Sequence, residues 1–115
     1  MLSYKDKGIL LNIIDHCIRV EENLVDLDRN KFDKEKNIKD SICFNILQIG
    51  ELAKHLSSDF NAIFNKVPWK QIKGMRDIIA HGYGTIEWDR VYQTAIKDIK
   101  PLHDYCDEIL KMNVN

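Results

Sequence analysis

The chain has 115 residues, a length that predicts a single domain spanning residues 1–115. Apolar residues make up 44% and charged residues 30%, a balance outside the disordered class. The net charge of −1 argues against a protein that coats nucleic acid through bulk charge, so any contact with RNA or DNA must come from a local patch. No apolar run has the length of a membrane span and the N-terminus is unlike a signal peptide. We therefore expect a cytoplasmic protein without membrane contact.

The first third of the chain predicts one long helix followed by a charged connector. Apolar residues recur at three- and four-residue steps over residues 9–27. Ser3, with Asp6 three positions later, resembles a capping box for this helix. The segment 28–37 is charged, with Phe32 as its only apolar residue. It is interpreted as a connector, with the second helix beginning in its second half.

The second helix is predicted to be the most buried, because its apolar stripe over residues 38–56 is the widest. Gly50 inside it indicates close approach by a neighbouring group. The sequence Ser57-Ser58-Asp59 then ends the run and is expected to cap a short helical turn.

The remaining pattern predicts a third helix beginning at Pro68 and ending at Gly82, and a last helix capped by Thr85. Pro101 lies inside the last helix and should kink or split it. With two prolines and no strong alternating stretch, the fold class is all-α: a bundle of four main helices with short extra helical turns.

The three cysteines, Cys17, Cys43 and Cys106, are interpreted as buried thiols because each falls in an apolar helical pattern. No closely spaced Cys/His pairs occur, so we expect no metal site.

The predicted third helix carries the residues that are the strongest candidates for a catalytic site. Arg76 lies at the edge of its apolar face, where an unpaired charge is costly, so it should meet a carboxylate such as Glu51 or point into a cleft. Lys73, Asp77 and His81 share another face, so that Asp77 can hydrogen-bond His81. Arg76 and His81 are about 140° apart around an ideal helix, so they converge only if the helix distorts or two copies of the chain meet. A purely structural interpretation, with His81 at the negative end of the helix dipole, also fits this spacing.

The string from 75 to 83, MRDIIAHGY, resembles the R-x4-H-x-Y motif of the HepT-like toxins, which belong to the HEPN superfamily. Two flanking blocks extend the resemblance over essentially the whole chain. IGELAK at 49–54 is similar to a block of the family's second helix, and VPW at 67–69 with Ile72, Gly74 and Met75 is similar to the run before the motif.

The resemblance implies a HEPN-like bundle and a metal-independent endoribonuclease, the toxin of a toxin–antitoxin module. Arg76 and His81 would be catalytic, with Asp77 and Glu51 supporting them. Tyr83 would be adenylylated by an MntA-type nucleotidyltransferase antitoxin. A homodimer would bring two motifs into one cleft, no cofactor would be needed, and RNA would be the substrate.

Other features are ambiguous from the sequence alone. Lys70 and Lys73, together with Lys54, could widen a positive cleft for RNA, but scattered helical lysines more often face solvent. Trp69 and Trp88 could stack on bases, although each more often anchors packing. His16, His55 and His103 have no motif around them and receive no role. A second class of function stays open: a non-catalytic helical partner that binds or regulates a nucleotidyltransferase.

Overall fold

The computed structural model describes residues 2–66, 69, 72, 74 and 86–112, and all regular secondary structure in these ranges is helical. Its six bounded helices are α1 (Tyr4–Leu24), α2 (Arg29–Lys34), α3 (Lys36–Ala53), α4 (Ser58–Ile63), α6 (Trp88–Lys97) and α7 (Ile99–Met112). The predicted all-α fold class is thereby confirmed. Trp69, Ile72 and Gly74, which fall in the predicted third helix, are helical as well.

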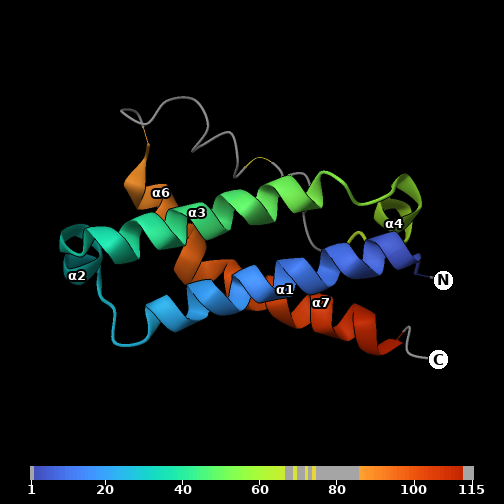
Figure 1. Ribbon diagram of the computed structural model, residues 1–115, viewed down its shortest axis with the longest axis horizontal. Coiled ribbons are helices and arrows are strands. Elements are labelled where there is room, and N and C mark those ends of the chain that lie inside the picture. Colours follow the sequence, from blue (N-terminus) through green and yellow to red (C-terminus); the bar gives the residue numbers. More distant parts are fainter. Residues whose placement is uncertain (1, 67–68, 70–71, 73, 75–85, 113–115) are drawn as a thin grey trace.

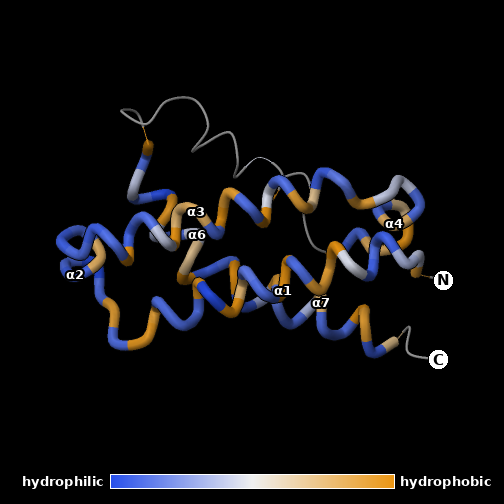
Figure 2. Tube along the Cα trace, viewed as in Figure 1, coloured by the Kyte–Doolittle hydropathy of each residue, from blue (hydrophilic) through white to orange (hydrophobic). Residues whose placement is uncertain are grey.

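The long helices α1 and α3 lie side by side and run in opposite directions, and α7 packs along α1 (Figure 1). Both chain ends and α4 lie at one end of this arrangement, and α2 lies at the other (Figure 1). Apolar and polar residues alternate along each long helix, which places one apolar stripe per helix toward the shared core (Figure 2). The fully buried side chains include Leu10, Ile13, Ile46, Ile49 and Ile109.

The predicted N-terminal caps are confirmed for two helices. The Ser3 hydroxyl accepts a hydrogen bond from the Asp6 amide at 3.0 Å, and the Ser57 hydroxyl accepts one from the Phe60 amide at 3.1 Å. Helix α1 ends at Leu24 and not at Leu27, because Val25 is extended and Asp26 adopts a positive φ of 57°.

One predicted interpretation and one predicted boundary are wrong, whereas the second long helix, α3, begins at Lys36, in the second half of the segment 28–37, as predicted. The charged segment 28–37 is not merely a connector: Asp28 caps α2, and Phe32 of α2 is fully buried. The last helix begins at Trp88 with Glu87 as its N-cap residue, later than a Thr85 cap would place it, and Thr85 itself lies outside the described residues. Asp89 lies in its first turn, as predicted.

The predicted break near Pro101 is confirmed and is located at Asp98, between α6 and α7. Pro101 is the third residue of α7, where an amide has no partner within its own helix. A continuous helix would need that amide to bond the carbonyl of Lys97, so the missing N–H favours a new helix start just before the proline.

Candidate functional site

The predicted motif residues Arg76, Asp77, His81 and Tyr83 lie outside the described residues, as do Lys70 and Lys73. Their roles and their convergence therefore stay predictions. The described residues do establish how the chain enters and leaves this segment.

Trp69 anchors the chain before the motif. Its indole Nε1–H donates a hydrogen bond to the Phe64 carbonyl at 2.5 Å, and only 6% of the residue is exposed. Its ring lies 5.4 Å from the Phe60 ring of α4 and 6.4 Å from the Tyr105 ring of α7, between centroids. Among the two interpretations of Trp69, these contacts support packing over base stacking.

Apolar residues on both sides of the motif are part of the core. Ile72 is 4% exposed before the motif, and Ile86 is 9% exposed after it. Val91, one turn into α6, is also buried. The segment that carries the motif is therefore attached at both ends to the packed interior, and the fold constrains where it begins and ends.

Glu51 and Lys54 lie at the C-terminal end of α3. Glu51 is half-buried and Lys54, the C-cap residue, is exposed. Gly50, next to Glu51, is buried, in line with the close packing that the sequence predicts for it. The pairing of Glu51 with Arg76 stays a prediction.

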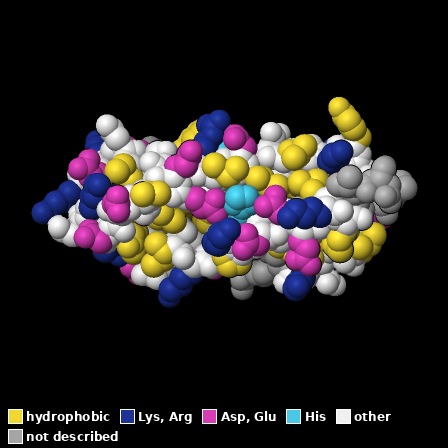
Figure 3. Space-filling view, turned by 90° about the horizontal axis from the view of Figure 1, so that it is seen from below, with side chains coloured by type: hydrophobic (Ala, Val, Ile, Leu, Met, Phe, Trp, Pro, Cys, Tyr) yellow, Lys and Arg dark blue, Asp and Glu magenta, His cyan; other side chains and the backbone are white. Residues whose placement is uncertain are grey.

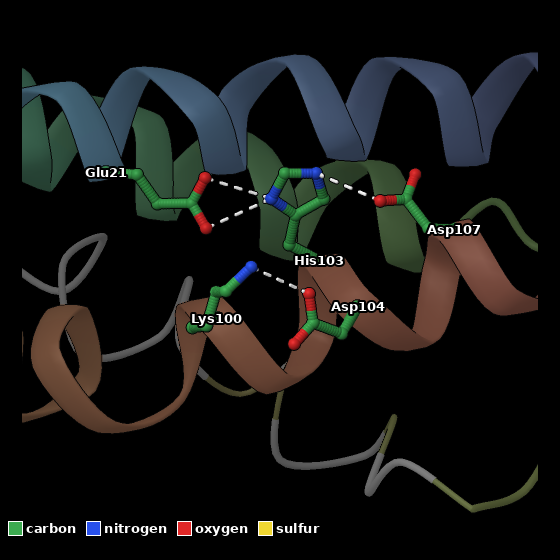
Figure 4. Close-up of polar contacts among 5 residues, drawn as sticks. All are labelled: Glu21, Lys100, His103, Asp104 and Asp107. Atoms are coloured by element: carbon green, nitrogen blue, oxygen red, sulfur yellow. Dashed lines mark hydrogen bonds and ion pairs between the residues drawn. The ribbon is translucent and has the colours of Figure 1, made fainter.

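His103, to which no sequence motif assigns a role, joins α1 to α7. His103 Nδ1 lies 2.9 and 3.0 Å from the two carboxylate oxygens of Glu21, and its Nε2 lies 3.4 Å from Asp107 (Figure 4). Lys100 pairs with Asp104 at 2.9 Å beside it (Figure 4). Figure 3 shows this face, with a histidine between acidic side chains at the surface. The contact links α1 to α7 through Glu21 and His103, which are 82 positions apart in the sequence.

A second histidine joins α1 to α3. His16 Nδ1 lies 2.8 Å from Oδ1 of Asn45, a residue that is only 4% exposed. The Asn45 amide nitrogen donates to the Ser41 carbonyl at 2.8 Å, and Asn23 donates to the Ser41 hydroxyl at 3.0 Å. These bonds satisfy a buried amide, so the network stabilises the helix pair.

Trp88 belongs to an aromatic cluster between α2 and α6. Its ring lies 6.3 Å from the Phe32 ring, and the Lys39 ammonium is 4.4 Å from its centroid. Arg29 pairs with Asp89 at 2.5 Å and lies over the Tyr92 ring at 5.5 Å. These contacts support the packing interpretation of Trp88 and fix the start of α6.

The three cysteines are buried free thiols, as predicted. Burial raises the pKa of Cys43 to about 11 and that of Cys106 to about 12, and it raises the pKa of Cys17 further. Thiols in this state are poor nucleophiles and poor ligands. Within the described ranges, no group of three or more His, Cys, Asp or Glu side chains is arranged to hold a metal ion. None of the described helices has the length and apolar character that a membrane span requires.

Comparison with known proteins identifies the family. The family model described as "Ribonuclease HepT-like" matches residues 13–109, which include most of the helical core and the whole of the 75–83 motif, and the chain therefore belongs to the HepT-like family. It is 30% identical to "Putative RNase MJ1380" of Methanocaldococcus jannaschii, over 81% of this chain and 85% of that protein.

Two further relatives agree with this assignment. "Putative RNase TTE0752" of Caldanaerobacter subterraneus is 30% identical over 89% of this chain and 91% of its own length. "Probable ribonuclease HepT" of Thermococcus cleftensis is 29% identical over 55% of this chain and 57% of its own length. No solved structure matches the chain significantly.

Proposed function

We propose that the chain is a metal-independent endoribonuclease that acts as the toxin of a toxin–antitoxin module. The observation that carries the proposal is the family match over residues 13–109, because the matched region contains the complete Arg76-x4-His81-x-Tyr83 sequence. The relatives' names, which refer to RNases, support the same activity.

The motif residues suit RNA cleavage without a metal. His81 accepts the proton of a ribose 2′-hydroxyl, and the 2′-oxygen attacks the adjacent phosphorus. The bond from phosphorus to the 5′-oxygen breaks, and that oxygen receives a proton from the second His81 of a homodimer. Arg76 binds the phosphate oxygens as negative charge develops on them. The products are a 2′,3′-cyclic phosphate and a 5′-hydroxyl.

Asp77 and Glu51 have supporting roles in this proposal, in which Asp77 orients His81 and Glu51 pairs with Arg76. Lys70 and Lys73 add positive charge for the RNA backbone. Because the net charge of the whole chain is −1, the site is expected to bind a few nucleotides and not a long RNA track.

Tyr83 provides the means of control. It follows Gly82 and precedes Gly84, a context in which a modifying enzyme can reach the hydroxyl. Attachment of AMP by an MntA-type nucleotidyltransferase antitoxin would place negative charge and bulk next to His81, and RNA would be excluded by repulsion and blockage.

The test is cleavage of end-labelled RNA in excess EDTA by the wild type, by His81→Ala and by the matched control His55→Ala. His55 is exposed and lies outside the motif, so its loss removes an imidazole but none of the residues that the proposal assigns to the site. We expect cyclic phosphate ends from the wild type and His55→Ala, and no cleavage by His81→Ala. Equal cleavage by all three proteins would show that His81 is not catalytic.

Intact mass spectrometry accompanies this assay, because an AMP group on Tyr83 would silence the wild type. A wild type of unmodified mass that cleaves no RNA would overturn the proposal. That result would favour the second class of function, a helical partner of a nucleotidyltransferase.

A further inference from the structure

The His103 ring lies between two carboxylates that come from different helices. Its Nδ1 is 2.9 and 3.0 Å from the two oxygens of Glu21 on α1, and its Nε2 is 3.4 Å from an oxygen of Asp107 on α7 (Figure 4). Only 15% of the His103 side chain is exposed, so solvent reaches little of the ring. We refer to the contacts of His103 with Glu21 and Asp107 as the His103 link.

The two carboxylates determine how many protons the ring needs. An ionised carboxylate can only accept a hydrogen bond, so the Nδ1 of His103 has to donate to Glu21. A neutral imidazole has one donor and one acceptor nitrogen, and the lone pair on its Nε2 would then face the carboxylate of Asp107. The imidazolium form carries a proton on both nitrogens and the positive charge that both carboxylates attract. The arrangement therefore fits the charged ring better than the neutral one.

The charged groups of α7 around the ring leave a place for this positive charge. Lys100 pairs with Asp104 at 2.9 Å, although it also lies within electrostatic range of Glu21 and Asp107. Among the side chains that the structure describes, His103 is the one cation that forms an ion pair with Glu21 or with Asp107. A neutral ring would therefore leave these two carboxylates without a paired cation.

The other groups near the link do not supply that charge. Cys17, one turn before Glu21 on α1, and Cys106 on α7 are buried thiols, and burial raises the pKa of Cys106 to about 12 and that of Cys17 further, so both stay uncharged at physiological pH. Arg19 on α1 pairs with Asp15 at 3.1 Å. The ion pairs of α6 lie at the start of that helix. The charge state of the link therefore depends on its own ring.

We propose that His103 is a pH-sensitive link between α1 and α7: the protonated ring holds Glu21 and Asp107 together, and loss of its proton weakens the docking of α7 on α1. Because the folded contacts favour the protonated ring, their contribution to stability is present at low pH and is lost as the pH rises. Imidazole side chains change charge between roughly pH 5 and 8, so the link responds in this range. The inference does not depend on the proposed function.

The helix that this link holds also contacts the chain that enters the motif. The Tyr105 ring, two residues after His103, lies 6.4 Å from the Trp69 ring between centroids. The apolar contacts of α7 do not change with pH, because they come from buried side chains such as Leu102 and Ile109. Loss of the proton should therefore weaken the docking of α7 without unfolding the domain.

His16 provides a contrast on the same helix. Its Nδ1 lies 2.8 Å from Oδ1 of Asn45, and the Asn45 amide nitrogen donates to the Ser41 carbonyl, which fixes the orientation of the amide. His16 therefore donates through Nδ1 whether its ring is neutral or charged, and its partner is an uncharged amide. This contact between α1 and α3 should depend little on pH.

Thermal unfolding at pH 5.5 and at pH 8.5, followed by circular dichroism, tests the proposal. The variant His103→Gln keeps a polar side chain that cannot take up a proton. We expect its loss of melting temperature, relative to the wild type, to be larger at pH 5.5 than at pH 8.5 by about 3–6 °C. His16→Gln is the matched control, and its loss should differ by less than about 2 °C between the two pH values.

A double-mutant cycle then assigns the effect to the contact with Glu21. At pH 5.5 the variant His103→Gln/Glu21→Gln should lose clearly less than the sum of the two single losses, and this gap should narrow at pH 8.5. Glu22→Gln removes the same charge from the adjacent, exposed position, and its loss should add to that of His103→Gln at both pH values. Equal losses for His103→Gln at the two pH values, or a gap that does not change, would overturn the proposal.

Nuclear magnetic resonance of the wild type tests the same point without any substitution. Long-range ¹H–¹⁵N spectra show which ring nitrogens carry protons. We expect protons on both nitrogens of His103 at pH 5.5, and at pH 8.5 a single proton on Nδ1, where Glu21 accepts it. A neutral ring with its proton on Nε2 would contradict the proposal even if a variant failed to fold. RNA cleavage is not a readout here, so failure of this inference and failure of the proposed function remain distinguishable.

Discussion

The Asp6 carboxylate joins the N-terminal end of α1 to the N-terminal end of α4. It is only 3% exposed in the first turn of α1. Its two oxygens accept hydrogen bonds from the Ser57 amide at 3.0 Å and from the Ser57 hydroxyl at 2.6 Å. Ser57 is also the N-cap of α4, so one carboxylate positions the helix that supports Trp69 through Phe60. Asp6→Asn therefore tests this link between α1 and α4 most directly.

The size of the effect follows from these two bonds. An asparagine keeps an oxygen for the Ser57 amide but turns an NH2 group toward the Ser57 hydroxyl, which loses its acceptor. A hydrogen bond to a charged group contributes about 1.5–3 kcal/mol, and we expect the free energy of unfolding to fall by that amount. For a domain of this size the melting temperature should fall by about 5–15 °C.

The pH dependence gives a second, independent signature. Burial opposes ionisation of Asp6, but the bonds from Ser57 outweigh it and hold the pKa of the carboxyl below its usual 3.8. A group whose pKa is lowered by folding stabilises the native state above its unfolded pKa, and this contribution is lost as the pH falls through the folded pKa. The difference between wild type and Asp6→Asn should therefore be full at pH 7 and shrink below about pH 4.5.

Urea unfolding followed by circular dichroism measures both quantities. The matched control is Asp15→Asn, which removes the same charge from the same helix, where the side chain is 56% exposed and pairs with Arg19. We expect that control to change stability by less than about 0.5 kcal/mol. If Asp6→Asn behaves like Asp15→Asn at pH 7, or if its deficit is the same at low pH, the reasoning is refuted.

Three further predictions concern the core and the helix faces. Gly8→Ala should raise the free energy of unfolding by about 0.5–1 kcal/mol, because the added methyl group meets no atom and the unfolded chain loses conformational freedom. A lower free energy of unfolding in urea would contradict this prediction. Trp69→Phe should lower the free energy of unfolding by about 0.5–1.5 kcal/mol, because the hydrogen bond to the Phe64 carbonyl is lost while an aromatic ring remains. A melting temperature equal to that of the wild type would show that this hydrogen bond contributes nothing to stability. Cys43, with a pKa of about 11, should be about a thousandth ionised at pH 8, so iodoacetamide should alkylate it only after unfolding; rapid alkylation of the native protein, detected by mass spectrometry, would contradict the buried state.

The helices that were predicted well are those whose signals are local. Ser3 and Ser57 cap their helices because a hydroxyl before an amide two or three positions later is a short-range arrangement that the sequence states directly. Pro101 splits the last helix because a missing N–H acts on the residue four positions before it. The sequence does not reveal α2 within the segment 28–37, because this short helix is held by one buried side chain, Phe32, whose partners Trp88 and Tyr92 are distant in sequence.

The polar contacts were not predictable for the same reason. His103 meets Glu21 across 82 residues and His16 meets Asn45 across 29, and no spacing rule relates such positions. A carboxylate such as Asp6 was assigned to the local capping box, yet its oxygens bond a serine 51 residues away. The motif at 75–83 differs from all of these because its residues are close together in the chain, so a pattern reveals it without the fold. The fold adds a constraint at the two ends of the motif, because Trp69 and Ile72 are buried before it and Ile86 is buried after it. Substitutions of these three residues should therefore displace the motif residues without removing any of their reacting groups.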